Sequence, residues 1–246
     1  HRARRSGGAI GVRAEGASAR LRDEDPALAR DRGAHLIRGV CFDFGDTLFH
    51  SPDGAAIIAE AGVAPAVARQ LWDKIWRDSK TPEALAVRRD LSPEAHRSGW
   101  TALFEQADVH RPGLSTLLYE RVMDHRRWLP YPDAERVLRE LRARGRRIGV
   151  VSNVAADLRP VFVARGWGEL IDGYAHSYEL GIEKPDVRIF RAACDAIGTT
   201  PSETVVVGDH AIDGGAVAAG CVVLLLPRVD PGRPRGLERV LDLVVI

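Results

Sequence analysis

The sequence predicts an α/β protein, a Rossmann-like parallel sheet with helices on both faces that is interrupted by an inserted all-helical domain. Short apolar runs recur along the chain, and each closes on a small polar cluster, which is typical of parallel strands buried on both faces. Between the first run and the next lies a helix-rich stretch of about 75 residues, which is too long for a loop. The 246 residues, of which 45% are hydrophobic, are enough for one large domain with an insert.

The first predicted strand is IRGVCFDF at 37–44, which is rich in strand-forming residues and ends at Gly45. Three later runs repeat the design, and they are RIGVVSN at 147–153, ETVVVGD at 203–209 and CVVLLLP at 221–227. A weaker candidate is DGYAHSYEL at 172–180, and the apolar run LDLVVI at 241–246 ends the sequence. We expect these strands to be covered by helices on both sides.

Two helices of the core are predicted from apolar residues at helical spacing and from a glycine at the end of each. The first is PDAERVLRELRARG at 132–145, which stops at Gly145. The second is DVRIFRAACDAIG at 186–198, which stops at Gly198 in the same way. Both helices lie between predicted strands, as a parallel sheet requires.

The inserted domain, residues 53–129, is expected to stand over the carboxyl-terminal edge of the sheet. Four of the five tryptophans fall within it, and we expect them to pack between helices rather than to contact a ligand. Its predicted helical segments are IIAEAG, PAVARQLWDKIWRD, PEALAVRRD, PEAHRSGWTALFEQADV and LSTLLYERVMDHRRWL. The remaining divisions are a basic, solvated tail at 1–36 and a core formed by 37–52 and 130–246.

The composition excludes several classes of protein. The formal net charge of +1 gives no reason to propose nucleic acid or an anionic membrane as a partner. The longest apolar stretch is far shorter than a membrane span, and the first residues lack the apolar core of a secretory signal. Three widely spaced cysteines among apolar residues favour a reducing compartment, so we expect a cytoplasmic protein.

The polar clusters at the strand ends carry the functional prediction. Parallel sheets bind ligands at the carboxyl ends of their strands, and three of these ends supply Asp43, Ser152 with Asn153, and Asp209. Lys184 lies in the loop that follows the weaker strand. The chain has only 3 lysines beside 32 arginines. Lysine at position 184 is therefore better explained by a need for a compact ammonium than by an ordinary surface charge. Carboxylates, a hydroxyl, an amide and an ammonium together suit phosphoryl transfer with Mg²⁺.

Four motifs give the chain a family resemblance. They are DFGDTL at 43–48, VVSN at 150–153, EKPD at 183–186 and GDHAID at 208–213. In order and spacing they resemble the motifs of the haloacid dehalogenase-like hydrolases over roughly residues 37–246. The position of the helical insert is similar to the α-helical cap of subfamily I in that family.

The resemblance implies catalytic roles for individual residues. Asp43 corresponds to the nucleophile that forms an aspartyl-phosphate, and Lys184 to the cation that neutralises charge on the nucleophile and on the phosphoryl group. Ser152 corresponds to a hydrogen-bond donor to the phosphate, with Asn153 as a second donor.

The resemblance also implies a magnesium site. Asp43 and Asp209 correspond to ligands of Mg²⁺, and the backbone carbonyl of Gly45 is a further ligand. Asp213 would support the metal through water or through a hydrogen bond to Lys184.

One position departs from the pattern of the family's phosphatases. Those enzymes carry a second aspartate two residues after the nucleophile, and it protonates the leaving oxygen; here Gly45 stands at that position and Asp46 follows it. A positioned general acid contributes about 10²–10⁴ in rate. Either the turn brings Asp46 into the missing role, or the leaving group needs no acid, or catalysis is slow.

The sequence therefore predicts a Mg²⁺-dependent hydrolase of a small phosphorylated metabolite, and it leaves the substrate and the oligomeric state open. A second interpretation is a catalytically weak protein of the same fold that binds a ligand or partner, because Gly45 replaces the acid. A third is a metal-independent 2-haloacid dehalogenase, which we rank last because Asp209 and Asp213 would repel Asp43 without a cation.

Overall fold

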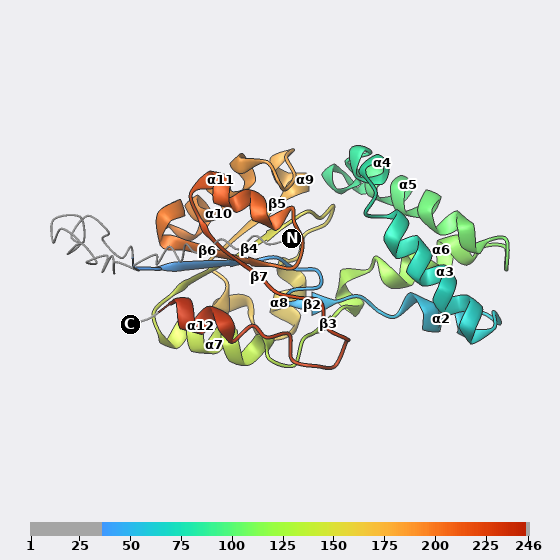
Figure 1. Cartoon of the computed structure of the whole chain (residues 1–246), viewed down its shortest axis with the longest axis horizontal. Helices are drawn as coiled ribbons and strands as arrows, with labels where there is room; N and C mark the ends of the chain where they lie inside the picture. The colour runs from blue at the N-terminus through green and yellow to red at the C-terminus, as the bar shows by residue number, and fades with distance from the viewer. Residues whose placement is uncertain (1–35, 245–246) are drawn as a thin grey trace, which may run out of the picture. The chain divides into compact units, whose positions relative to one another are not determined.

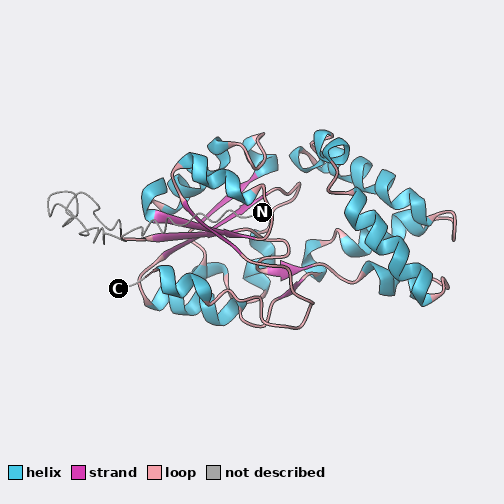
Figure 2. Ribbon diagram, in the orientation of Figure 1, coloured by secondary structure: helices cyan, strands magenta, loops and turns pink. Residues whose placement is uncertain are grey.

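The computed structural model of the protein describes residues 36–244, and a five-stranded parallel sheet lies at its centre (Figures 1 and 2). The strand order is β5-β4-β1-β6-β7. The strands are β1 (Gly39–Phe42), β4 (Arg147–Ser152), β5 (Gly173–His176), β6 (Thr204–Gly208) and β7 (Val222–Leu225). The predicted fold class is confirmed, and the order places β1, which precedes Asp43, in the middle of the sheet.

Helices cover both faces of the sheet (Figure 1). One face packs on α10 and α11 through Cys41, Val151 and Val206, and the other packs on α7, α8 and α12 through Val40 and Phe42. The core helices are α7 (Ala134–Ala143), α8 (Arg159–Ala164), α9 (Ser177–Leu180), α10 (Val187–Ile197), α11 (Ala216–Ala219) and α12 (Arg239–Leu243). The predicted helices at 132–145 and 186–198 correspond to α7 and α10.

Five helices lie between β1 and β4, and we call them the cap. They are α2 (Gly54–Glu60), α3 (Pro65–Asp78), α4 (Pro82–Ala86), α5 (Pro93–Phe104) and α6 (Leu114–Val122). Four of them, α2, α3, α5 and α6, share a second hydrophobic core. The antiparallel pair of β2 (Phe49–His50) and β3 (Leu129–Pro130) flanks them. An inserted helical region is thus present, whereas the domain boundaries at 53 and 129 stay a prediction.

Proline and short polar side chains start the cap helices where the sequence has them. Ser92 accepts a hydrogen bond from the backbone of Ala95 at the start of α5, and a proline occupies the first turn. Thr81 caps α4 in the same way. Short 3₁₀ turns complete the described chain, and they are η1 (Arg89–Leu91), η2 (Glu105–Ala107), η3 (His125–Arg127), η4 (Gly168–Leu170), η5 (Pro201–Glu203) and η6 (Asp213–Gly215).

Two expectations from the apolar runs are wrong. Burial on both faces fails for β7, in which Val222 and Leu225 are 42% and 46% exposed, because this strand lies at the edge of the sheet. The run LDLVVI does not continue as a strand, since α12 includes its first three residues. Residues 1–35, the predicted basic tail, and 245–246 lie outside the described residues. Among the described helices, none has the length and apolar character needed to cross a membrane.

Candidate active site

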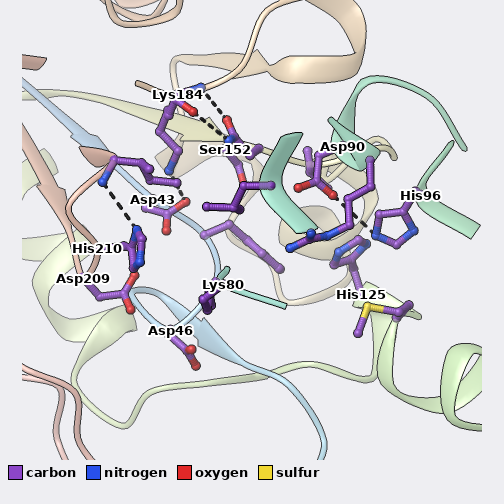
Figure 3. Close-up of a pocket in the computed structure, with 18 of the residues that line it drawn as sticks. Asp43, Asp46, Lys80, Asp90, His96, His125, Ser152, Lys184, Asp209 and His210 are labelled. Carbon is purple, nitrogen blue, oxygen red and sulfur yellow. Dashed lines mark hydrogen bonds and ion pairs between the residues drawn. The ribbon is translucent and has the colours of Figure 1, made fainter. Parts of the chain in front are cut away.

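The carboxyl-terminal edge of the sheet brings together the polar side chains that the sequence singled out. Asp43 follows β1, Ser152 ends β4, and Asp209 follows β6. Lys184 lies in the turn between α9 and α10. All four line one cavity of about 140 Å³, around which Figure 3 shows them.

Lys184 joins two carboxylates at the base of this cavity. Its Nζ lies 2.7 Å from Asp43 Oδ1 and 2.7 Å from Asp213 Oδ1, and its side chain is only 2% exposed. Burial alone would lower the pKa of this ammonium, but the charges of Asp213 and Asp43 outweigh burial and raise the pKa. Lys184 is therefore a fixed positive charge beside Asp43.

Asp213 is fully buried, and both of its carboxylate oxygens are engaged. Oδ1 accepts a hydrogen bond from Lys184, and Oδ2 accepts from the backbone N–H groups of Asp209 and His210 at 3.2 and 3.0 Å. Gly208 permits this approach, because a Cβ there would lie 2.3 Å from the Asp213 carboxylate. Asp213 thus holds Lys184 and the Asp209 turn in place, and its role toward a metal stays a prediction.

Asp43, Asp209 and Asp213 form an acidic group that suits a metal ion, since one oxygen of each lies within 4.8 Å of the others. Burial raises the pKa of the Asp43 carboxyl to about 7, where Lys184 opposes the shift and Asp213 and Asp209 add to it. Burial, followed by the charge of Asp46, also raises the pKa of Asp209. A divalent cation would offset this repulsion and favour the ionised carboxylates, so the residues fit Mg²⁺, which prefers oxygen ligands.

Ser152 and Asn153 differ in what they do. Ser152 is 4% exposed and faces the cavity that Asp43 lines. Asn153 binds the backbone of Lys184 twice, because its Nδ2 donates to the Lys184 carbonyl at 3.1 Å and its Oδ1 accepts from the Lys184 N–H at 2.7 Å. This clamp was not foreseen from the sequence, and the roles of both residues as donors to a phosphate stay predictions.

The turn after Asp43 decides where Asp46 lies. Gly45 packs against the ring of Trp128, which a Cβ at position 45 would meet at 3.2 Å. Asp46 has a left-handed φ of 52° and lines the cavity, with Arg228 Nη2 3.7 Å from its Oδ2. Its carbonyl accepts a 2.6 Å hydrogen bond from Nε of the buried Arg235. The fixed turn thus brings the carboxylate of Asp46 to the cavity.

The cap supplies the other part of the cavity lining. None of its lining side chains was predicted from the sequence to belong to the site. They are Trp76, Lys80, Leu85, Arg89, Asp90, His96, Trp100, Met123 and His125. His210, which was not predicted as a site residue, lines the core side. The expected packing of the tryptophans is present, with Trp76 5.5 Å from Trp72 and 5.8 Å from Trp100 between ring centroids, and Trp76 and Trp100 also face the cavity.

Three titratable groups occur in the cap part of the cavity, of which His96 is buried and Asp90 and His125 are partly buried. Burial lowers the pKa of His96 to about 3 and that of His125 to about 4, so both imidazoles are neutral at pH 7. Burial raises the pKa of Asp90 to about 6. His96 Nδ1 lies 2.9 Å from the hydroxyl of Tyr119, whereas its Nε2 lies 3.8 Å from Asp90.

The cap and the core contact each other beside Lys184. Glu183 Oε1 accepts a hydrogen bond from the backbone of Asp90 at 3.3 Å, and Glu183 Oε2 lies 3.4 Å from Arg88 Nε. On the core side, Ser177 Oγ donates to the Asp90 carbonyl at 2.6 Å. We call these contacts the Glu183 latch, and they attach η1 of the cap to the edge of the site.

A model of the haloacid dehalogenase-like hydrolases matches residues 37–220. The chain belongs to this family. The match covers four of the five strands of the sheet, the cap and all four motifs, so the resemblance seen in the sequence is confirmed. Among its relatives are phosphatases and dehalogenases, and the family membership makes the protein a hydrolase of this class.

Individual relatives differ in activity. Phosphoserine phosphatase of Thermus thermophilus is 34% identical over 149 residues, which are 60% of this chain and 59% of that protein. Glyceraldehyde 3-phosphate phosphatase of Methanothermobacter thermautotrophicus is 32% identical over 205 residues, 78% of this chain and 86% of that protein. (S)-2-haloacid dehalogenase 4A of Burkholderia cepacia is 35% identical over 88 residues, 35% and 38% of the two chains.

Solved structures share the architecture of core and cap. A dehalogenase in an intermediate complex has a TM-score of 0.67 at 23% identity, covering 86% of this chain and 98% of that one. A phosphatase of the family from Thermococcus onnurineus has a TM-score of 0.53 at 21% identity, covering 83% and 97%. At this level of identity, these solved structures establish the fold of the chain but not the reaction that it catalyses.

Proposed function

We propose that this protein hydrolyses phosphate monoesters of small metabolites, with Asp43 as the nucleophile and Mg²⁺ as the cofactor. The observation that carries the proposal is the gathering of Asp209 and Asp213 around a buried Asp43. Lys184 supplies one positive charge against these three carboxylates, so a site without a metal ion leaves negative charge uncompensated, and Mg²⁺ would offset it. The phosphatases among the relatives support the same choice.

Asp43 would attack phosphorus through Oδ2, because Oδ1 is held by Lys184. The bond from phosphorus to the leaving oxygen breaks, and an aspartyl-phosphate forms. Water then attacks phosphorus, phosphate leaves, and the Asp43 carboxylate is regenerated. Lys184 offsets negative charge throughout, and Ser152 would donate a hydrogen bond to a phosphoryl oxygen.

Asp46 would exchange protons in both steps. It lines the cavity, and its charge acts on Asp209, which places it on the side of the acidic group (Figure 3). In the first step it would protonate the leaving oxygen, and in the second it would accept a proton from the attacking water. This assignment fills the role left vacant by Gly45.

The residues that would hold Mg²⁺ are Asp43, Asp209 and the carbonyl of Gly45, with Asp213 supporting them. Bound there, the ion would neutralise charge that develops on the phosphoryl group. Asp213 fits a supporting role because Lys184 and two backbone N–H groups already occupy its oxygens.

The test is phosphate release from p-nitrophenyl phosphate and a panel of phosphate monoesters, with Mg²⁺ or with EDTA. We expect Mg²⁺-dependent release by the native protein and background release by Asp43→Asn, which keeps the size of the side chain. The proposal fails if the native protein never exceeds the Asp43→Asn control across the panel.

Two other functions are alternatives, and each has its own measurement on the same purified protein. Tight Mg²⁺ and phosphate-analogue binding without turnover would favour a binding protein, as Gly45 suggests. Halide release from 2-haloacids that EDTA does not change would favour the dehalogenase reaction.

A further inference from the structure

Two cations on the cap part of the cavity form no close ion pair within the described residues. Lys80 follows α3, and its Nζ lies 5.3 Å from the centroid of the Trp76 ring. Arg89 is 6% exposed and stacks on Trp100, with 4.7 Å between its Cζ and the ring centroid. Within residues 36–244, no carboxylate oxygen comes within 4.0 Å of either group's nitrogens. Both side chains line the cavity that holds Asp43.

Arg89 is held rigidly but keeps unused hydrogen-bonding capacity. Its Nη1 donates to the Ala84 carbonyl and its Nη2 to the Ser79 carbonyl, each at 2.9 Å. Its Nε is buried, and in the described part of the chain it has no hydrogen-bond partner. The charge of Asp90 compensates this buried guanidinium without pairing with it, so an anion that binds beside Arg89 is stabilised further.

The cap part of the cavity carries a net positive charge at neutral pH. Lys80 and Arg89 contribute two positive charges, Asp90 contributes at most one negative charge, and both histidines are neutral. The acidic group of Asp43 and Asp209 lies on the core side instead, and Figure 3 shows Lys80 between that group and the cap histidines. A substrate whose phosphate is held by the core would thus present its other end to this positive region.

We propose that Lys80 and Arg89 form a subsite for a carboxylate on the leaving group, so that the preferred substrates are small phosphorylated hydroxy acids. The inference rests on the phosphatase function proposed above. A guanidinium and an ammonium both pair with a carboxylate through charge-assisted hydrogen bonds. The cavity of about 140 Å³ is well below the roughly 300–1,000 Å³ of sites for larger ligands, so the leaving group is small.

Lys74 provides a matched control for Lys80. It lies on α3, six residues earlier, but its Nζ is 2.6 Å from Asp78 and 2.6 Å from Gln106. It does not line the cavity. Replacing Lys74 therefore removes a cap lysine without touching the proposed subsite.

The experiment compares three two-carbon phosphate esters that differ only at the far end. They are 2-phosphoglycolate with a carboxylate, 2-hydroxyethyl phosphate with a neutral hydroxyl, and O-phosphoethanolamine with an ammonium. For the native protein we expect kcat/KM for the carboxylate ester to exceed that for the neutral ester by about tenfold or more, as one charge-assisted hydrogen bond implies. Lys80→Ala should reduce this ratio about tenfold, Lys80→Arg should retain most of it, and Lys74→Ala should not change it.

The outcomes separate this inference from the function on which it rests. Loss of all phosphate release, including that from p-nitrophenyl phosphate, contradicts the phosphatase proposal. Release from all esters with a ratio near one, unaffected by Lys80→Ala, overturns the subsite alone. Preference for O-phosphoethanolamine also overturns it and would assign recognition to Asp90.

Binding gives a second readout that does not need turnover. In the Asp43→Asn background, calorimetry should show 2-phosphoglycolate binding at least about tenfold more tightly than 2-hydroxyethyl phosphate. Adding Lys80→Ala should remove the difference. Equal binding of the two esters in the Asp43→Asn protein would overturn the subsite.

Discussion

Lys184 compensates the negative charge of the site, because its one ammonium forms ion pairs with both Asp43 and Asp213. Lys184→Met leaves these two buried groups facing each other without a cation. We expect the free energy of unfolding at pH 7 to fall by about 3–5 kcal/mol, as it does for other buried ion pairs that lose one partner. Urea denaturation measures this change.

The control for that variant is Lys74→Met, which breaks an exposed ion pair worth only about 0–1 kcal/mol. Phosphate release by Lys184→Met should also fall to background. Equal stability of the two lysine variants would show that Lys184 carries no structural charge balance.

Asp46 gives a second prediction for a single residue. Asp46→Asn should lower kcat for alkyl phosphates by about 10²–10⁴, because their leaving oxygen needs a proton. p-Nitrophenyl phosphate should be much less affected, since its leaving group departs without one. Steady-state kinetics on both substrates measure the contrast, and Asp230→Asn, at an exposed position outside this cavity, is the control. An equal loss on both substrates would exclude proton donation by Asp46.

The sequence predicted that the core residues of the site would lie together, which the structure bears out, whereas their roles stay predictions and the cap residues were not predicted. Asp43, Lys184 and Asp209 follow strand ends, and a parallel sheet brings such ends together whatever lies between them. The clamp of Asn153 on Lys184 could not be predicted, because it depends on side-chain geometry within the loop. The cap side chains follow no motif, and only the packing of separate helices brings Arg89 and Lys80 to one cavity.

Among the elements, η1 connects the cap to the core through the Glu183 latch. Glu183→Ala should remove the hydrogen bond to Asp90 and the ion pair with Arg88. A hydrogen bond to a charged group contributes about 1.5–3 kcal/mol, so we expect KM to rise roughly tenfold as η1 loses its contact with the core beside the site. Steady-state kinetics measure KM, and hydrogen exchange at residues 88–91 should accelerate in parallel.

Glu183→Gln keeps an acceptor for the Asp90 N–H and removes only the charge. Because the ion pair with Arg88 is largely exposed on the arginine side, this variant should retain most of the native KM. If Glu183→Ala also leaves KM and exchange unchanged, the latch does not govern access to the site.

Element positions were predicted where periodicity and helix signals agree. α3 begins at a proline and ends where the apolar spacing ends, and α10 stops at Gly198, whose left-handed φ of 69° suits glycine. One failure is the helix α12 in place of a strand at 241–246, and the other lies at the edge of the sheet. β7 has the same apolar composition as a central strand, and composition alone does not say which strand is last in the order.

For the whole molecule, the neutral histidines of the cap contribute a stability that is lost in acid. The pKa of His125 is about 4 in the folded protein and about 6.5 in an unfolded chain, so the unfolded state binds the proton first as pH falls. The stability from the neutral imidazole is therefore full above pH 6.5 and is lost toward pH 4. Asp43 and Asp90, with their raised pKa values, act in the opposite direction below about pH 7 and about pH 6, so the contribution of His125 is measured by comparing variants.

His125→Gln should remove about 2 kcal/mol of the stability difference between pH 7 and pH 5. Urea denaturation at both pH values measures the difference, and His110→Gln, at an exposed position, is the matched control. The same pH dependence in the native protein and in His125→Gln would mean that this imidazole is not held neutral by the fold.

The central claim, that Asp43 takes the phosphoryl group, can be measured on the protein itself. A reaction of the native protein with a phosphate monoester and Mg²⁺ is quenched in acid during turnover, and the peptide that contains Asp43 is examined by mass spectrometry. We predict one added phosphoryl group on Asp43, its loss on hydroxylamine treatment, and its absence from Asp43→Asn. Turnover of the ester with an unmodified Asp43 peptide, or with the phosphoryl group on another residue, would contradict the account.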